Sequence, residues 1–201
     1  MHPSLPAARD LLCELARFGP VDSFSWDSGR ARDDSGISVA VPFEQGLKLL
    51  KAVRAKLPGG LVAFLGTTRV IGAQEKRRFV EVVVGPGEGP AAILRLARCG
   101  GGKGGPGTEA VVAKVEAWSR LSPLDLFHAE TASLELLLAK VPPDVEALAK
   151  DVFAFSPDTV HRGCGTLEIL TKQIGETGRI LMWWEPPEVP DPKGVQYREM
   201  R

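Results

Sequence analysis

The sequence lacks the features that mark several common classes of protein. Its 3 cysteines, Cys13, Cys99 and Cys164, are odd in number and far apart, so we expect no disulfide framework and a reducing compartment. Lys and Arg together number 25, as do Asp and Glu, so the chain carries no net charge. The basic surplus typical of nucleic-acid-binding proteins is therefore missing.

Nothing in the sequence indicates a membrane protein or an exported one. No apolar run approaches the roughly 20 residues that a membrane-spanning helix needs. The first residues, MHPSLPAARDLL, lack the basic segment followed by an apolar one that begins a secretory signal. We therefore expect a cytoplasmic protein with no membrane partner.

The sequence does contain enough apolar material for a real core. Of its 201 residues, 44% are apolar and 25% charged, which is typical of globular proteins. The apolar spacing predicts helices at 7–18, 43–57, 91–99, 108–121, 142–155 and 166–176, and strands at 23–26, 37–41, 61–66, 79–84, 124–130, 133–140 and 179–185. The run FVEVVV (79–84) is almost wholly apolar, which indicates a strand covered on both faces.

This order of elements predicts an α+β fold. We expect an antiparallel-rich mixed sheet, or two such sheets, with helices packed on one face and a split-βαβ-like C-terminal part. The basic stretch before residue 79 suggests a boundary between an N-terminal α+β subdomain, 1–75, and a C-terminal α+β domain, 76–201. One continuous domain is the alternative.

Residues 99–108, CGGGKGGPGT, raise the question of a phosphate-binding loop. A Walker loop needs G-x-x-x-x-G-K-S/T, but Lys103 is followed by Gly104, and Ala97 stands where the first glycine belongs. The stretch also follows a predicted helix rather than a strand. We interpret it as a flexible connector and expect no cofactor.

The stretch FAFSPDTVHRGCGTLE (153–168) concentrates reactive side chains. His161 and Cys164 could supply two ligands to zinc, but a structural zinc site needs two more. His161 and Cys164 could also form a nucleophile pair. We favour a third interpretation, a structural loop in which Ser156 or Asp158 caps a turn.

Two other short segments carry candidate side chains. His128 and Glu130 alternate along a predicted strand and point the same way, so they could form a proton-transfer dyad, although a solvated strand end is the interpretation we favour. The adjacent Trp183 and Trp184 must face opposite ways in a strand. We expect at least one of them outside the main core, as a protein-binding anchor or stacking platform, the alternative being that helices and the proline-rich tail cover both.

Several motifs together resemble a known family. They are FLGTTR (64–69), VVVGPGEGPAAILRLAR (82–98), PPDVEALAKDVFAFSPDTVHRGCGTLEILTKQI (142–174) and LMWWE (181–185). In order and spacing they resemble a bacterial family known as domain of unknown function 4253, over roughly residues 60–185. The resemblance implies no established activity.

The chain departs from the family pattern at informative positions. The resemblance implies a cysteine where this chain has Ser156, so a cysteine nucleophile would be lost here, although serine could substitute. It implies an acidic residue, glutamine and glycine where this chain has His161, Arg162 and Gly163, and an aspartate where Glu185 stands. The glycine run before residue 108 replaces a polar loop, which supports the connector interpretation.

Two functions from different classes fit these observations. The first, which we favour, is a non-catalytic protein-binding protein, such as an immunity protein that neutralises a toxin, with Trp183, Trp184, Arg162 and Glu185 as candidate binding residues. The chain shows no complete catalytic constellation, and its proline-rich tail could lie along a partner.

The second function is an enzyme or small-ligand-binding protein with its site around the 156–166 loop. Asp158 and His161 would be the acid–base pair and Arg162 the anion clamp, near His128, Glu130 and Glu185.

A nucleic-acid-binding role ranks third, because its only support is a short basic cluster. The cluster consists of Arg69, Lys76, Arg77 and Arg78. Such runs are usually solvated linkers, so we expect no nucleic-acid partner.

Overall fold

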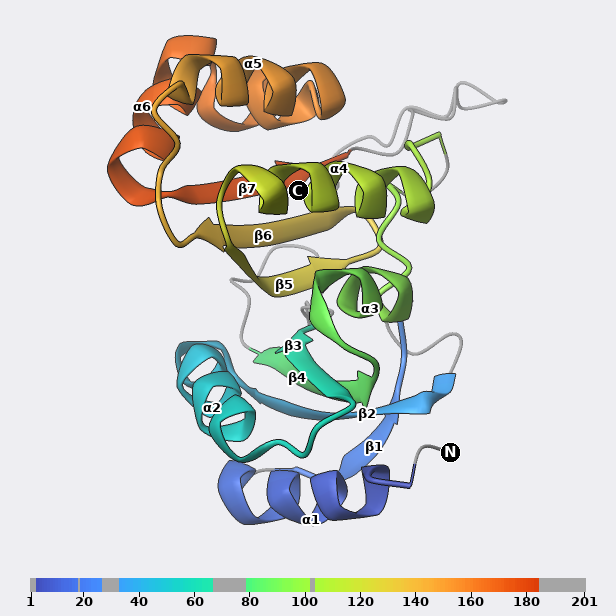
Figure 1. Ribbon diagram of the computed structural model, residues 1–201. Coiled ribbons are helices and arrows are strands. Elements are labelled where there is room, and N and C mark those ends of the chain that lie inside the picture. Colours follow the sequence, from blue (N-terminus) through green and yellow to red (C-terminus); the bar gives the residue numbers. More distant parts are fainter. Residues whose placement is uncertain (1–2, 18, 27–32, 67–78, 102–103, 185–201) are drawn as a thin grey trace, which may run out of the picture.

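The computed structural model describes residues 3–17, 19–26, 33–66, 79–101 and 104–184 (Figure 1). In chain order its elements are α1 (Leu5–Ala16), β1 (Val21–Phe24), β2 (Asp33–Pro42), α2 (Phe43–Lys56), β3 (Leu61–Leu65), β4 (Phe79–Pro86), α3 (Gly89–Leu96), α4 (Thr108–Leu121), β5 (Leu124–Glu130), β6 (Ser133–Leu138), α5 (Val145–Phe155), the short π-helix η1 (Thr159–Cys164), α6 (Leu167–Thr177) and β7 (Arg179–Trp183). None of these helices is long and apolar enough to cross a membrane.

The strands form one sheet in the order β1-β2-β4-β3-β5-β6-β7. All neighbouring strands are antiparallel except β3 and β5, which run parallel and meet where Leu65 pairs with His128. This confirms the predicted antiparallel-rich α+β sheet. In the C-terminal part, β7 returns directly beside β6, whereas a split βαβ unit would leave another strand between them.

The sheet does not divide where the sequence suggests a domain boundary. β4 begins after residue 75, yet it pairs with β2 on one side and with β3 on the other, and both of these precede the boundary. The division into two domains stays a prediction, and the hydrogen-bonded sheet crosses it.

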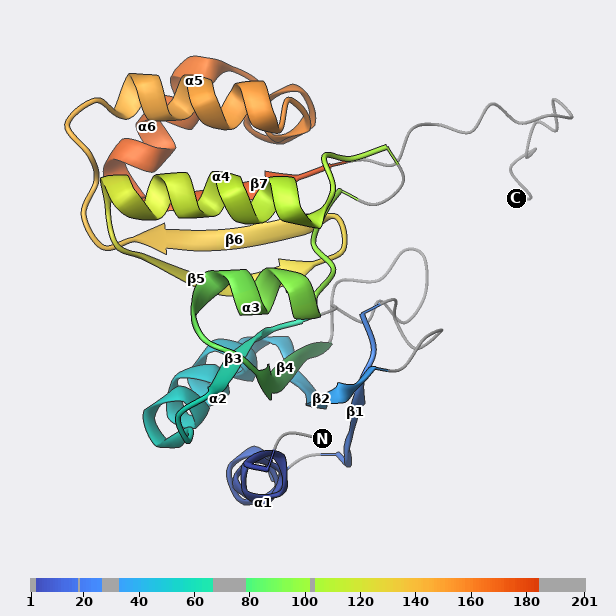
Figure 2. The ribbon, with the colours of Figure 1, turned by 45° about the vertical axis from the view of Figure 1, so that its right-hand side comes forward.

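Helices cover the two ends of the sheet on opposite faces (Figures 1 and 2). Leu61, Ala63 and Leu65 of β3 pack in a core with α1 and α2. Val62 and Phe64 of the same strand pack in a second core with α3 to α6. β4 is buried on both faces, as the run FVEVVV predicts.

The helix α5 packs on α4 through a polar contact. Asp151 accepts hydrogen bonds from the Lys114 ammonium and from the Trp118 indole, each at 2.8 Å. Burial opposes ionisation of Asp151, but these two hydrogen bonds and the charge of Lys114 outweigh burial and lower its pKa. The α4–α5 pair is therefore held by a charged group as well as by apolar packing.

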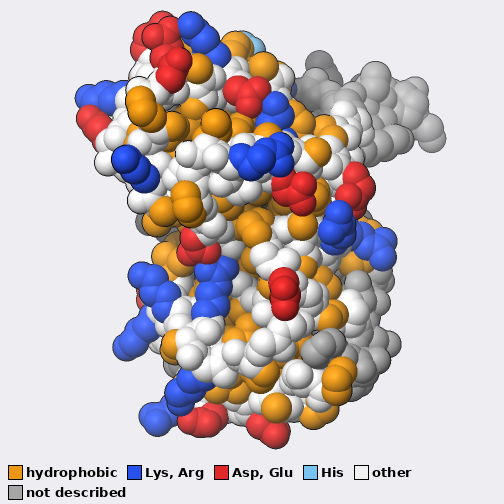
Figure 3. Space-filling view, in the orientation of Figure 1, with side chains coloured by type: hydrophobic (Ala, Val, Ile, Leu, Met, Phe, Trp, Pro, Cys, Tyr) orange, Lys and Arg blue, Asp and Glu red, His pale blue; other side chains and the backbone are white. Residues whose placement is uncertain are grey.

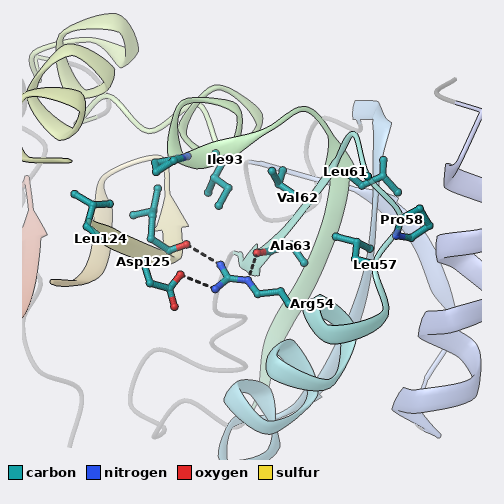
Figure 4. Close-up of a pocket in the computed structure, with 13 residues that line it drawn as sticks. Arg54, Leu57, Pro58, Leu61, Val62, Ala63, Ile93, Leu124 and Asp125 are labelled. Atoms are coloured by element: carbon teal, nitrogen blue, oxygen red, sulfur yellow. Dashed lines mark hydrogen bonds and ion pairs between the residues drawn. The ribbon is translucent and has the colours of Figure 1, made fainter. Parts of the chain in front are cut away.

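Arg54 of α2 joins the two ends of the sheet where β3 and β5 diverge (Figure 4). Its Nε donates to the Ala63 carbonyl of β3 at 2.8 Å, and one Nη donates to the Leu126 carbonyl of β5 at 2.8 Å. The other Nη bonds Asp125 Oδ1 at 2.6 Å. The planar guanidinium thus takes the place of strand-to-strand hydrogen bonds across this gap.

Replacing Arg54 with methionine tests this role. Arg54→Met leaves the Ala63 and Leu126 carbonyls without their donor, so the free energy of unfolding should fall by about 1–3 kcal/mol. Urea unfolding followed by circular dichroism measures the change. Lys51→Met, at an exposed position of the same helix, is the matched control and should stay within about 0.5 kcal/mol of the wild type. Equal losses in the two variants would contradict the bridging role.

Candidate functional site

The candidate residues of the 156–166 loop lie on η1 and the turn before it. His161 and Arg162 are exposed, and the His161 ring packs edge-to-face on Phe153 of α5 at 5.3 Å between ring centroids. Cys164 is half-buried, and its Sγ lies 3.4 Å from the Thr166 carbonyl oxygen. Across the described ranges, no three His, Cys, Asp or Glu side chains gather in a way that could hold a metal ion.

His128 and Glu130 form a hydrogen-bonded pair on β5. The His128 Nε2 lies 3.1 Å from Glu130 Oε1, so these side chains point the same way, as their spacing predicts. His128 is buried and lies beside Leu65 of β3, which belongs to the core with α1 and α2. Phe153, on which His161 packs, borders the core on the opposite face. The structure therefore does not bring the two candidate groups together.

Ser156 stands where the family resemblance implies a cysteine, and it is 0% exposed. Its Oγ donates to the Trp183 carbonyl at 2.8 Å and lies 2.9 Å from Thr159 Oγ1. Thr159 Oγ1 also accepts from the Trp183 N–H at 3.4 Å. Because each hydroxyl has one proton, Thr159 must donate to Ser156, and the four groups close a ring. Ser156 thus fastens η1 to β7 and is not accessible as a nucleophile.

The two tryptophans at the end of β7 lie on opposite sides, as predicted. Trp184 is 6% exposed, donates from Nε1 to the Phe155 carbonyl at 3.3 Å, and packs edge-to-face on the Phe155 ring. Trp183 is half-buried and faces a groove. Glu185, the other candidate in this segment, lies outside the described residues, as does the basic cluster of residues 69–78.

The described part of the glycine-rich stretch is a compact turn held by backbone hydrogen bonds, and its flexibility as a connector stays a prediction. The N–H groups of Gly100 and Gly101 both donate to the Thr131 carbonyl at 3.0 Å. A Cβ on Gly105 would lie 2.4 Å from the Gly100 carbonyl oxygen. Glycine is required here because two backbone segments approach too closely for a side chain. Gly102 and Lys103 lie outside the described residues.

Two hollows remain as candidate sites. One, of about 380 Å³, lies beside Arg54 between β3 and β5 and has apolar walls that include Val62, Ile93 and Leu124 (Figure 4). Its one charged donor, Arg54, already bonds three oxygen atoms of the protein. We therefore regard this hollow as structural.

The second hollow is a groove of about 520 Å³ along the outer edge of β7, called the β7 groove below. Leu181 and Trp183 of β7 line one side, and Leu170 and Gln173 of α6 line the other, with Cys164 of η1 at the same opening. The groove contains two of the residues predicted from the sequence, Trp183 and Cys164. The rest could not be identified from the sequence, because only the fold places α6 beside the edge of β7.

One ion pair borders the β7 groove. Arg179 pairs with Glu135 of β6 and also lies over the Phe127 ring, 5.6 Å from its centroid. Arg179 remains 54% exposed, whereas Glu135 is 15% exposed. Elsewhere, on the face shown in Figure 3, side chains of both charge signs are interspersed. The groove is thus mainly apolar, with an accessible cation at one end.

Removing the Ser156 hydroxyl should loosen η1 from β7. We expect Ser156→Ala to lower the free energy of unfolding by about 1–3 kcal/mol, because the buried Trp183 carbonyl loses its donor. Ser119→Ala is the matched control, since its hydroxyl bonds a carbonyl on the exposed side of α4. Urea titration of the two variants measures the free energy of unfolding. If Ser156→Ala lowers it no more than the control does, the hydrogen-bond ring does not stabilise the fold.

The three thiols should differ sharply in reactivity. Burial, reinforced by the nearby Glu130 charge, raises the pKa of the Cys99 thiol to about 12, whereas Cys13 is exposed and Cys164 half-buried. A thiol with a raised pKa forms little reactive thiolate. At pH 8, iodoacetamide should label Cys13 and Cys164 in the folded protein and Cys99 only in denaturant, as read by peptide mass spectrometry. Labelling of Cys99 at the rate of Cys13 in the folded protein would contradict this burial.

Comparison with known proteins identifies a family but no similar curated protein or solved structure. A family model described as "Domain of unknown function (DUF4253)" matches residues 81–185, which confirms the resemblance and starts later than the motifs suggest. No curated protein and no solved structure matches the chain. The matched region contains Ser156, Trp183, Trp184 and every residue that lines the β7 groove. Since it spans more than half of the 201 residues, the chain belongs to the DUF4253 family, whose function is unknown.

Proposed function

We propose that this protein acts by binding another protein, without chemistry of its own, and that the partner docks in the β7 groove. The observation that carries the proposal is the position of the groove at the free edge of the sheet. Leu181 is 51% exposed there beside the half-buried Trp183. An exposed apolar side chain next to an aromatic one is typical of the centre of a protein interface.

The placement of the candidate catalytic residues supports a binding role over an enzymatic one. A general acid–base mechanism needs its groups within hydrogen-bond reach of one reacting centre. His161 packs on Phe153 at the surface, whereas His128 is paired with Glu130 on β5. Ser156 is enclosed by its hydrogen-bond ring. Among the described residues, the His161 side chain and the His128–Glu130 pair therefore offer no shared centre for a substrate.

A narrower form of the proposal is an immunity protein that neutralises a toxin. Its support is association, because a small neutral α+β protein of an uncharacterised family fits that role without any site that requires it. This narrower proposal makes one further prediction. The partner should be toxic to cells when it is expressed alone and harmless when it is expressed together with this protein.

Affinity capture with matched baits tests the binding role. Tagged wild-type protein should retain one stoichiometric partner from a lysate of its own cells, identified by mass spectrometry. Leu181→Glu should lose that partner, because a carboxylate in the groove opposes apolar contact. Leu121→Glu, at a 63% exposed position outside the groove, should retain it.

The result against the proposal would be a clean bait, or a partner held equally by both variants. Either outcome would move the function away from the β7 groove. Circular dichroism of the three baits ensures that folding does not explain the difference.

A second candidate function is binding of a small molecule in the same groove. Its volume of about 520 Å³ falls within the range of ligand pockets, and the 156–166 loop contributes Thr159, Gly163 and Cys164 to its wall. The same variants separate this candidate from protein binding. A ligand found by thermal-shift screening should lose its effect in Leu181→Glu while the capture experiment stays clean.

A further inference from the structure

The edge of β7 exposes the backbone of one residue to the groove. The Gly178 carbonyl accepts from the Leu138 N–H, and the Trp184 N–H donates to the Ala132 carbonyl. In the segment 178–184, the backbone groups of the even-numbered residues therefore point toward β6 and the residues that flank it. Backbone groups alternate in direction along an antiparallel strand. Those of Arg179, Leu181 and Trp183 therefore point away from β6, toward the groove.

The protein itself covers the two ends of this edge. At Trp183, the N–H donates to Thr159 and the carbonyl accepts from Ser156. At Arg179, the N–H donates to Thr177 Oγ1 at 3.1 Å. The described residues supply no such partner to the N–H and carbonyl of Leu181, which lies midway between the two covered positions. The N–H groups at both ends of the edge are thus satisfied within the protein, whereas both backbone groups of Leu181 at its centre are open.

We propose that the β7 groove receives an extended peptide segment of a partner protein, which adds to the sheet as an antiparallel strand beside β7. The inference rests on the proposed function and specifies how the partner binds. One residue of the segment exchanges two backbone hydrogen bonds with Leu181. The half-buried Trp183 and the apolar Leu181 then contact its side chains on one face of the extended sheet.

The walls of the groove favour a bare segment over the edge of a second copy of this protein. η1 and α6 stand beside β7, with Leu170 and Gln173 of α6 lining the groove. A second copy that paired through its own β7 would carry the same two helices to this edge. An isolated extended segment has no such bulk and needs only the width of one strand.

The side chains along β7 specify the chemistry of the segment. Ser156 and Thr159 occupy the edge at Trp183, so the strand begins at the residue opposite Leu181 and continues past Arg179. The residue opposite Leu181 should be apolar, because it contacts Leu181 directly and lies diagonally across from Trp183. An acidic residue suits the position opposite Arg179, because Arg179 is 54% exposed. From its N-terminus the segment reads apolar, any residue, acidic.

A synthetic peptide tests the geometry without altering the protein. The probe is acetylated Ser-Val-Ser-Glu-Ser with fluorescein at its C-terminus, titrated with the full chain and followed by fluorescence anisotropy. N-methylation of the valine removes the N–H that faces Leu181 and should weaken binding at least about tenfold. N-methylation of the serine on either side should change binding little, because those N–H groups point away from β7.

A charge exchange tests the register. Arg179→Glu should weaken binding of the probe about tenfold and restore binding of a probe that carries lysine in place of glutamate. Arg120→Glu, at an exposed position in the last turn of α4, is the matched control and should change neither affinity.

The strand-addition proposal is overturned if no probe binds at up to about 1 mM, or if N-methylation acts equally at alternate positions. The proposed function fails separately. A captured partner that depends on Leu181, together with silent peptides, leaves protein binding in place and excludes strand addition. Peptides that obey the N-methylation pattern support strand addition even before a natural partner is identified.

Discussion

The parallel contact between β3 and β5 is the constraint on which the architecture depends. Every other pair of neighbouring strands is antiparallel, and this contact joins the α1–α2 end of the sheet to the α4–α6 end. The two parallel strands pair at Leu65 and His128, and two residues earlier in each strand Arg54 bonds the carbonyls of Ala63 and Leu126. Arg54 supplies these bonds from a helix, with one planar group that reaches both strands. The position of β7 relative to the rest of the sheet is set by this contact together with α3, which packs against β3, β4 and β5.

Side-chain hydrogen bonds to the backbone also occur at the edge strand β7. An edge strand exposes backbone groups that invite pairing with other chains, and proteins commonly cover them. Here the ring of Ser156, Thr159 and Trp183 covers one end of β7, and Thr177 covers the other. Although α6 lies beside β7, the described residues provide no partner for the N–H and carbonyl of Leu181 at the centre of the edge. An opening one residue wide admits a short strand and disfavours the extended edge-to-edge pairing that leads to aggregation.

Local patterns in the sequence predict the regular elements well, and long-range contacts explain the rest. Apolar periodicity predicts α4 at 108–121 and β5 at 124–130, and the structure has the same bounds. The short helix η1 is missed because its hydrogen bonds to β7 join residues far apart in the sequence. For the same reason, the alternation of Trp183 and Trp184 is predictable, but the groove that Trp183 faces is not. Arg54 looks like any solvated helix residue until the topology places β5 beside it.

The extent of the family match has a consequence for folding. The match begins at residue 81, inside β4, and both strands that pair with β4 precede it. A chain restricted to the matched region would expose both edges of β4 and the inner edge of β5, together with apolar residues such as Val82 that pack against α1 and α2. Exposed strand edges and apolar faces are unstable in water. In this protein the N-terminal helices and strands therefore complete the sheet of the family region, with β2 and β3 pairing both edges of β4.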